Sequence, residues 1–245
     1  MKLVLSTLLL MYSGIALAAE CVILLHGLAR SASTMEKLEV KLIDNGYIVA
    51  NIDYPSRHLE VEKLAELAVG AGISECAEAN ASPLNFVTHS LGGILVRQYY
   101  KIHEPESLHR VVMLGPPNNG SEVVDNFRNV PGYELLNGPA GLQLGTAPDS
   151  VPLKLGPVNF QLGVIAGTQS MNPILSLFLE NPDDGKVSVK STKVEGMCAH
   201  VSLPTMHPFM MKNEAAIDEV LSFLASGEFK SEQALAVECP EFLNE

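Results

Sequence analysis

The fold of this chain is decided by the stretch Leu84-Asn85-Phe86-Val87-Thr88-His89-Ser90-Leu91-Gly92-Gly93. The apolar residues 84–88 predict a buried strand, and the amphipathic residues 94–103 predict a helix. A serine at such a sharp strand-to-helix turn is held out at the carboxyl edge of a sheet, provided that the residues two positions away on either side are small. Gly92 meets this requirement, whereas Thr88 replaces the usual glycine. A serine before two glycines is otherwise a simple helix cap, but the strand and helix around Ser90 favour a nucleophile.

The rest of the chain repeats the same alternation of strand and helix. Further strands are predicted at residues 22–25, 47–53, 110–114, 160–166 and 201–203. Helices are predicted to begin at a capping box at residues 33–36, near residue 59, and near residue 215. Strands separated by helices indicate an α/β fold, with a mostly parallel, six-stranded sheet covered by helices on both faces.

A His-Gly pair follows the first of these strands. His26-Gly27-Leu28 comes directly after residues 22–25, next to the strand that leads to Ser90. A tetrahedral oxyanion needs two N–H donors that are already in place. Leu91, at the start of a helix, and Leu28 are the residues that we expect to supply them. Taken alone, His26-Gly27 would be read as an ordinary turn.

An acid and a histidine complete the expected catalytic residues. Asp184 follows the fifth strand and stands directly before Gly185, with Asp183 as the alternative, and Asp-Gly is also a common solvated turn. His207 lies past the last short strand, in a loop at the same sheet edge as Ser90. His200, at the start of that strand, is expected to be structural. The order Ser90, Asp184, His207 is the one typical of a serine nucleophile activated by a histidine that an acid orients.

The first 18 residues have the pattern of a secretory signal peptide. Lys2 is followed by an apolar run over residues 3–17 that ends in Ala16-Leu17-Ala18. The run is shorter than the roughly 20 residues of a membrane-spanning helix, so an uncleaved anchor is the less favoured alternative. Glu20 directly before Cys21 argues against a lipoprotein signal. We therefore expect an exported domain, residues 19–245, in the periplasm or secreted.

Composition narrows the classes of partner. The chain has 47% apolar and 18% charged residues, which is typical of a globular protein, and a formal net charge of −12. An acidic surface repels phosphate backbones, so nucleic acid is an improbable partner. Four cysteines lack any Cys-x-x-Cys pair, so no zinc site or redox motif is expected.

Taken together, these motifs resemble the small bacterial lipases and esterases of the α/β-hydrolase superfamily. The residues that carry the resemblance are His26-Gly27-Leu28, Thr88 to Gly93, residues 114–121 (LGPPNNGS), residues 183–187 (DDGKV) and His207. The resemblance implies a hydrolase of carboxylic esters, acting on a small-molecule or lipid ester without cofactor, metal or stable membrane insertion. The fold's usual first two strands would then be absent. A thioesterase or acyltransferase with the same residues is the alternative, and a non-catalytic binding protein on this fold is a more distant one.

The same fold predicts two further features. It places Cys21 beside Cys76, and Cys198 beside Cys239, at the sheet edge opposite Ser90, so two disulfides with this pairing are expected. Residues 116–157 form a small insertion near the site, in which 13 residues are Gly or Pro. We therefore expect no long amphipathic lid helix, although the insertion's apolar residues, Leu135 and Leu136 among them, must be buried against something.

Overall fold

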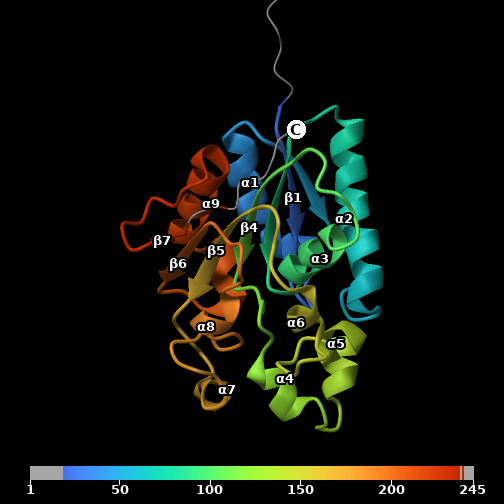
Figure 1. Cartoon of the computed structure of the whole chain (residues 1–245), viewed down its shortest axis with the longest axis vertical. Coiled ribbons are helices and arrows are strands. Elements are labelled where there is room, and N and C mark those ends of the chain that lie inside the picture. Colours follow the sequence, from blue (N-terminus) through green and yellow to red (C-terminus); the bar gives the residue numbers. More distant parts are fainter. Residues whose placement is uncertain (1–18, 238, 240–245) are drawn as a thin grey trace, which may run out of the picture.

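The computed structural model describes residues 19–237 and 239, so the predicted signal peptide lies outside the described residues. One twisted sheet runs through the molecule, in the order β2-β1-β3-β4-β5-β6-β7 (Figure 1). Six strands are parallel: β1 Cys21–Leu25, β2 Ile48–Ile52, β3 Leu84–His89, β4 Leu108–Leu114, β5 Gln161–Gly167 and β6 Ala199–Leu203. The six predicted strands and the α/β class are thus confirmed.

The described sheet also has a seventh strand, which corrects the prediction of six. β7, Leu235–Ala236, pairs antiparallel with Ala199 and His200 of β6. Both of its residues are exposed. A two-residue edge strand in a polar tail has no period that a sequence pattern could reveal.

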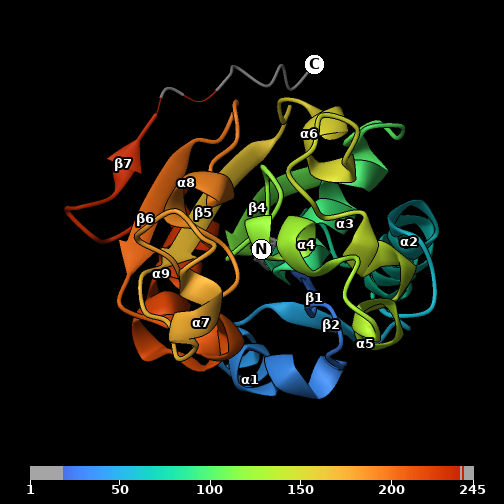
Figure 2. The same cartoon turned by 90° about the horizontal axis from the view of Figure 1, so that it is seen from below.

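Helices cover both faces of the sheet. α1, Glu36–Asp44, and α9, Glu214–Ser226, pack on one face, while α2, Val61–Glu78, and α3, Leu91–Tyr100, pack on the other (Figure 2). Within β1, Ile23 points into the α2 and α3 layer and Leu24 into the α1 and α9 layer. The central strands are apolar throughout because both of their faces are buried.

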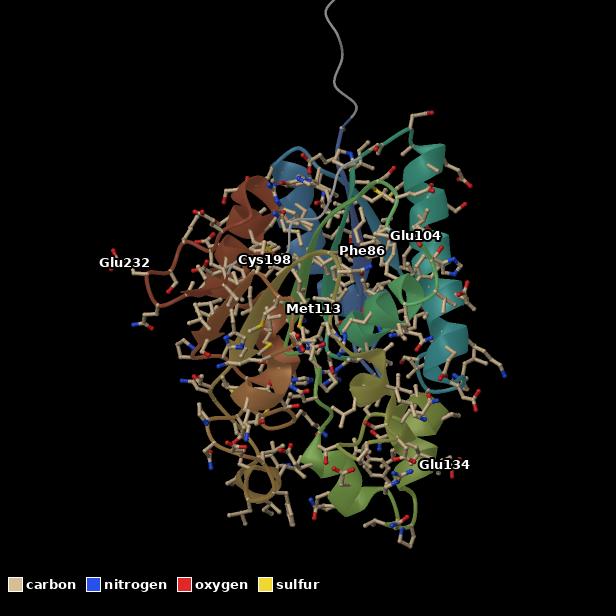
Figure 3. All side chains as sticks on the ribbon, viewed as in Figure 1. Phe86, Glu104, Met113, Glu134, Cys198 and Glu232 are labelled. Carbon is tan, nitrogen blue, oxygen red and sulfur yellow. A yellow bond between two sulfur atoms is a disulfide. The ribbon has the colours of Figure 1, made fainter. Side chains whose placement is uncertain are left out.

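The side chains follow this layering. Figure 3 shows Phe86 and Met113 in the middle of the molecule, while Glu134 and Glu232 lie at the periphery. Phe86 and Met113 are fully buried. The core therefore fixes the strands whose carboxyl ends carry the predicted site.

Two helix starts differ from the prediction. The capping box at residues 33–36 is wrong: η1, Ala32–Met35, is a 3-10 turn without a side-chain cap, and α1 begins only at Glu36. The Ser33 hydroxyl instead contacts the Ser31 hydroxyl at 2.9 Å. The second helix begins at Val61 and extends to Glu78, which brings Cys76 into its last turn.

Both predicted disulfides are present. Cys21 is bonded to Cys76 and Cys198 to Cys239, with Cα atoms 5.9 Å and 4.6 Å apart. Cys21 opens β1 and Cys198 directly precedes β6, so both bridges lie at the amino edge of the strands. Ser90 follows the carboxyl end of β3, at the opposite edge.

The insertion at residues 116–157 folds into three short helices rather than an irregular loop. These are α4 Glu122–Phe127, α5 Tyr133–Leu142 and α6 Val151–Leu155, and α5 is kinked at Gly138-Pro139. Val123 and Val124 are buried, but Leu135 and Leu136 are 83% and 64% exposed, so the expected burial of these two is wrong. Nothing in the insertion resembles a long lid helix. The helices of the described residues include none long and apolar enough to cross a bilayer.

The remaining short helices follow β5 and β6. α7, Pro173–Ser176, and α8, Val189–Thr192, lie between these strands, and η2, His207–Lys212, follows β6. Together with α4, α5 and α6 they gather at the end of the molecule to which the parallel strands point (Figure 1). The phenyl rings of Phe127 and Phe178 lie 5.2 Å apart, so the segments after β4 and β5 meet there.

Candidate active site

Ser90 occupies a strained turn between β3 and α3. Its backbone has φ 52° and ψ −116°, a region that residues other than glycine seldom adopt. The Ser90 N–H donates to the Leu114 carbonyl at 2.9 Å, which ties the turn to β4. A Cβ on Gly92 would lie 2.6 Å from the Leu25 carbonyl oxygen, so α3 can pass this close to β1 only with glycine there. The turn therefore has the shape that presents a serine hydroxyl at the sheet edge.

The position that departs from the usual motif is also accommodated. Thr88 is fully buried, and its hydroxyl has no hydrogen-bond partner among the described residues. The threonine side chain is thus taken into the core, while the turn keeps its form.

His207 is paired with Asp184. The His207 Nδ1 donates to Asp184 Oδ2 at 2.7 Å, and both side chains are buried. The other oxygen, Oδ1, accepts the N–H groups of Lys186 at 3.0 Å and Val187 at 2.8 Å. A carboxylate with these donors is held in one orientation, and it fixes the tautomer that leaves His207 Nε2 as an acceptor.

Asp183 has a different place. Its Oδ1 accepts the Gly185 N–H at 2.7 Å and the Ser176 hydroxyl at 2.8 Å, so it closes the turn and ties it to α7. Of the two adjacent acids, the structure brings Asp184 to the histidine.

His200 lies away from this pair. Its Nε2 contacts the Thr192 hydroxyl at 2.9 Å within the fold, and it does not line the cavity beside Ser90. Burial lowers the pKa of His200 to about 4, so its imidazole is neutral at physiological pH.

His89, which its place before Ser90 predicts to be a packing or hydrogen-bonding residue, has a partner that the sequence did not reveal. Its Nε2–H donates to the backbone carbonyl of His207 at 2.9 Å, and the two rings lie 4.7 Å apart. Burial, and then the neighbouring His207, lower the pKa of His89 well below its ordinary value, so this ring stays neutral. Its place directly before Ser90 was the one signal available.

The loop after β1 lies against the Ser90 turn. A Cβ on Gly27 would meet His89 Nδ1 at 2.6 Å and Ser90 Cβ at 3.3 Å. The N–H groups of Leu28 and Leu91 have no hydrogen-bond acceptor anywhere in residues 19–237 or 239. Two free N–H groups beside the serine are what an oxyanion requires.

His26 and Tyr54 hold that loop in place. Their rings stack at 4.0 Å, the Tyr54 hydroxyl donates to the His26 carbonyl, and the Tyr54 N–H donates to His26 Nε2 at 3.3 Å. His26 Nδ1 then donates to the Gly27 carbonyl at 2.9 Å. Burial raises the pKa of the Tyr54 hydroxyl and lowers that of His26, so the contact remains one between neutral groups.

Ser90 and His207 open onto one cavity of about 120 Å³. Its apolar wall comes from the loop after β1 and from the insertion: Leu28, Val123, Val124, Leu144 and Pro117. Its polar lining includes Arg30, Ser121, Asn137 and Lys186. The structure thus brings Ser90, His207 and Leu28 to one cavity, with Asp184 behind His207 and Leu91 beside Ser90.

Comparison with known proteins rests on structure alone, because the chain matches no protein-family model and no curated protein sequence. It is similar to the mature lipase BlEst2 of Bacillus licheniformis, with a TM-score of 0.66 and 19% identity over 86% of this chain and 93% of that one. It is also similar to the product of lin2722 from Listeria innocua, with a TM-score of 0.59 and 16% identity over 88% of this chain and 96% of that one. Lipase B of Aspergillus fumigatus gives 0.64 and 17% over 84% of this chain and 52% of the other.

Proposed function

Since the chain has the α/β-hydrolase fold, we propose that it is a serine hydrolase of carboxylic esters, with Ser90, Asp184 and His207 as its catalytic triad. One observation carries the proposal: Ser90, on its strained turn, shares a cavity with His207, whose Nδ1 lies 2.7 Å from Asp184 Oδ2. A serine hydroxyl is a weak nucleophile until a base of this kind takes its proton. A non-catalytic protein would have no need to keep all three groups in these positions.

Each residue has a step in the reaction. Ser90 Oγ attacks the ester carbonyl carbon while His207 Nε2 takes the hydroxyl proton, and the oxyanion is stabilised by the N–H groups of Leu28 and Leu91. His207 then gives the proton to the leaving alcohol, which departs and leaves an acyl group on Ser90. A water molecule attacks the acyl carbon while His207 takes its proton, and the acid is released as His207 returns that proton to Ser90 Oγ. Asp184 stabilises the imidazolium in both halves.

The cavity supports a substrate class. Leu28, Val124 and Leu144 offer an apolar wall for an acyl chain next to Ser90. A cavity of about 120 Å³ suits short or medium chains rather than long ones. The proposed substrates are therefore small-molecule esters, or lipid esters with chains of this size.

Export is proposed as well. Two disulfides are typical of proteins that fold in an oxidising compartment, which supports the periplasm or the exterior as the place of action. Mass spectrometry of the protein recovered from that compartment should find an amino terminus near residue 19, and recovery of an intact residue 1 there would contradict cleavage.

A fluorophosphonate probe tests the proposed function directly. The phosphonyl group should form one adduct, on the peptide that contains Ser90, and Ser90→Ala should abolish labelling. Ser33→Ala is the control, because Ser33 is exposed and lies outside the cavity, so this change should leave labelling intact. Labelling that persists in Ser90→Ala would reject Ser90 as the nucleophile.

A further inference from the structure

The cavity beside Ser90 carries positive charge on an acidic protein. The chain has 28 acidic and 16 basic residues, yet the residues that line the cavity include Arg30 and Lys186 and no aspartate or glutamate. We propose that the site takes esters that carry an anionic group, a carboxylate or a phosphate, next to the reacting ester, with Arg30 and Lys186 as its counter-charges. This inference rests on the proposed function and names its substrate class.

Arg30 and Lys186 line one cavity, so their charges repel each other. Burial, and then the charge of Arg30, lower the pKa of the Lys186 ammonium, while Asp184 opposes this effect. Asp184 already accepts the His207 ring N–H and two backbone N–H groups, so its charge is shared with them. An anion bound between Arg30 and Lys186 would relieve their repulsion.

Neither cation has a carboxylate partner within 4.0 Å among the described residues. Some lysines of the described residues do have one, such as Lys190 with Glu180 and Lys37 with Glu214, both at 2.9 Å, whereas others, such as Lys193 and Lys230, do not. Arg30 and Lys186 differ from the other cations of this kind because both line the cavity beside Ser90, where a ligand's charge can reach them.

The backbone of each residue is anchored close to the reacting groups, while both residues are exposed to solvent. The Lys186 N–H donates to Asp184 Oδ1 at 3.0 Å, and its carbonyl accepts the Ser121 hydroxyl at 2.7 Å. Arg30 follows Ala29, whose N–H donates to the Ser56 hydroxyl at 3.0 Å. Lys186 thus belongs to the turn that orients His207, and Arg30 to the loop that carries the Leu28 N–H.

The cations have no part in the triad itself. The proposed oxyanion is held by the N–H groups of Leu28 and Leu91, and the imidazolium by Asp184. Arg30 and Lys186 are therefore specificity residues, which stabilise a charge on the substrate away from the carbonyl.

Matched ester pairs test this inference. The first pair is 3-acetoxybenzoate and its neutral methyl ester. 3-Acetoxyphenyl phosphate provides the phosphate ester, and (3-acetoxyphenyl)trimethylammonium provides the cationic one. The second pair places the charge on the acyl side: methyl hydrogen adipate against methyl heptanoate. The measured quantity is kcat/KM for the charged ester divided by that for its neutral partner, at low salt. Because this ratio is taken within each variant, losses common to both esters cancel.

We expect a ratio above one for the carboxylate or phosphate ester in the wild type, which declines as salt is added. Lys186→Gln should lower it about fivefold, and Lys186→Glu or Arg30→Glu should turn the preference toward the cationic ester. Lys190→Gln removes one charge from the neighbouring helix, where the lysine pairs with Glu180, and should leave the ratio unchanged.

A wild-type ratio at or below one in every arm would overturn the inference, as would a ratio that Lys186→Gln and Lys186→Glu leave unchanged. In both cases hydrolysis of the neutral ester would leave the proposed function standing. Absence of any hydrolysis together with absence of fluorophosphonate labelling would instead overturn the proposed function, and this inference with it.

Discussion

At the scale of single residues, the site depends on side chains whose hydrogen-bond partners hold them in one orientation. Three of its histidines differ in this respect: His207 has a carboxylate at Nδ1, His89 has a backbone carbonyl at Nε2, and His26 accepts an N–H. Sequence order distinguished His207 from the others, because it alone follows the acid in a loop at the correct edge. The contact between His89 and the His207 carbonyl joins residues 118 positions apart, and no local pattern encodes it.

His200 gives a prediction for pH. Burial, with a smaller effect of Lys193, lowers its pKa from 6.5 to about 4 in the folded state. Below pH 6.5 the unfolded chain therefore binds the extra proton and the folded one does not, so stability is full above pH 6.5 and declines as the pH falls toward 4. Between about pH 7.5 and pH 4.5 this one group should remove about 2–3 kcal/mol.

Urea unfolding of the wild type and of His200→Gln, each at about pH 7.5 and about pH 4.5, measures this loss of stability. The variant should lose less stability on acidification, whereas His58→Gln, at an exposed position, should behave as the wild type. His200→Gln should also keep its esterase activity at neutral pH. Equal acid sensitivity in the wild type and His200→Gln would contradict the assigned surroundings of His200.

At the scale of elements, the turn between β3 and α3 decides the geometry. A positive φ at a residue other than glycine costs about 1–3 kcal/mol, and here the contact of Ser90 with β4 and the close approach of α3 to β1 maintain it. The sequence predicted this turn because an apolar strand, a serine and paired glycines stand in an order that few other structures need. It did not predict α4, α5 and α6, because helices of this length, interrupted by Gly and Pro, leave no sustained period.

Gly92→Ala tests the close approach. The new methyl group would lie 2.6 Å from the Leu25 carbonyl oxygen, a backbone atom that cannot move aside cheaply, so both stability and kcat should fall. The matched control is Gly70→Ala in α2, where a Cβ meets nothing within 4 Å. That change should raise stability by up to about 1 kcal/mol. Thermal melts and ester kinetics measure both, and a Gly92→Ala protein with wild-type melting and rate would contradict the packing.

The insertion predicts how the rate depends on ester concentration. The cavity reaches Ser90 without movement of any segment, and the helices of the insertion, α4, α5 and α6, are short. Dissolved short-chain and medium-chain esters should therefore be hydrolysed with a simple saturation curve that passes smoothly through the solubility limit. The measurement is rate against concentration for a series of acyl lengths. A sharp rise confined to the appearance of droplets would mean that part of the insertion closes the site.

At the scale of the whole molecule, the fold can be predicted from the apolar strands in the sequence, whereas the positive charge of the cavity cannot. Runs such as β1 and β3 are apolar throughout because helices cover both faces, and this is visible in the sequence. Arg30 and Lys186 come from loops more than 150 residues apart, and only the parallel sheet brings those loops together at one edge. The edge strand β7 was missed for a related reason, since two exposed residues acquire their structure from β6.

The disulfides stabilise this architecture from the edge opposite the site. Cys21 and Cys76 close a loop with a sequence separation of 55, so Cys21→Ala with Cys76→Ala should lower the free energy of unfolding by about 4 kcal/mol. Because the bridge lies at the amino edge of the strands, kcat/KM of the folded variant should stay within about twofold of the wild type. Urea titration and ester kinetics below the melting temperature measure the two effects. A large fall in kcat with unchanged stability would reverse this assignment.

The most direct measurement of the central claim is the kinetics of Ser90→Ala on a soluble ester, with the fold monitored by circular dichroism. The account predicts that kcat falls by about 10⁴-fold or more, while the spectrum and the melting temperature stay close to those of the wild type. Residual activity within tenfold of the wild type in a folded Ser90→Ala protein would contradict it, and the ester-cleaving nucleophile would then lie elsewhere in the chain.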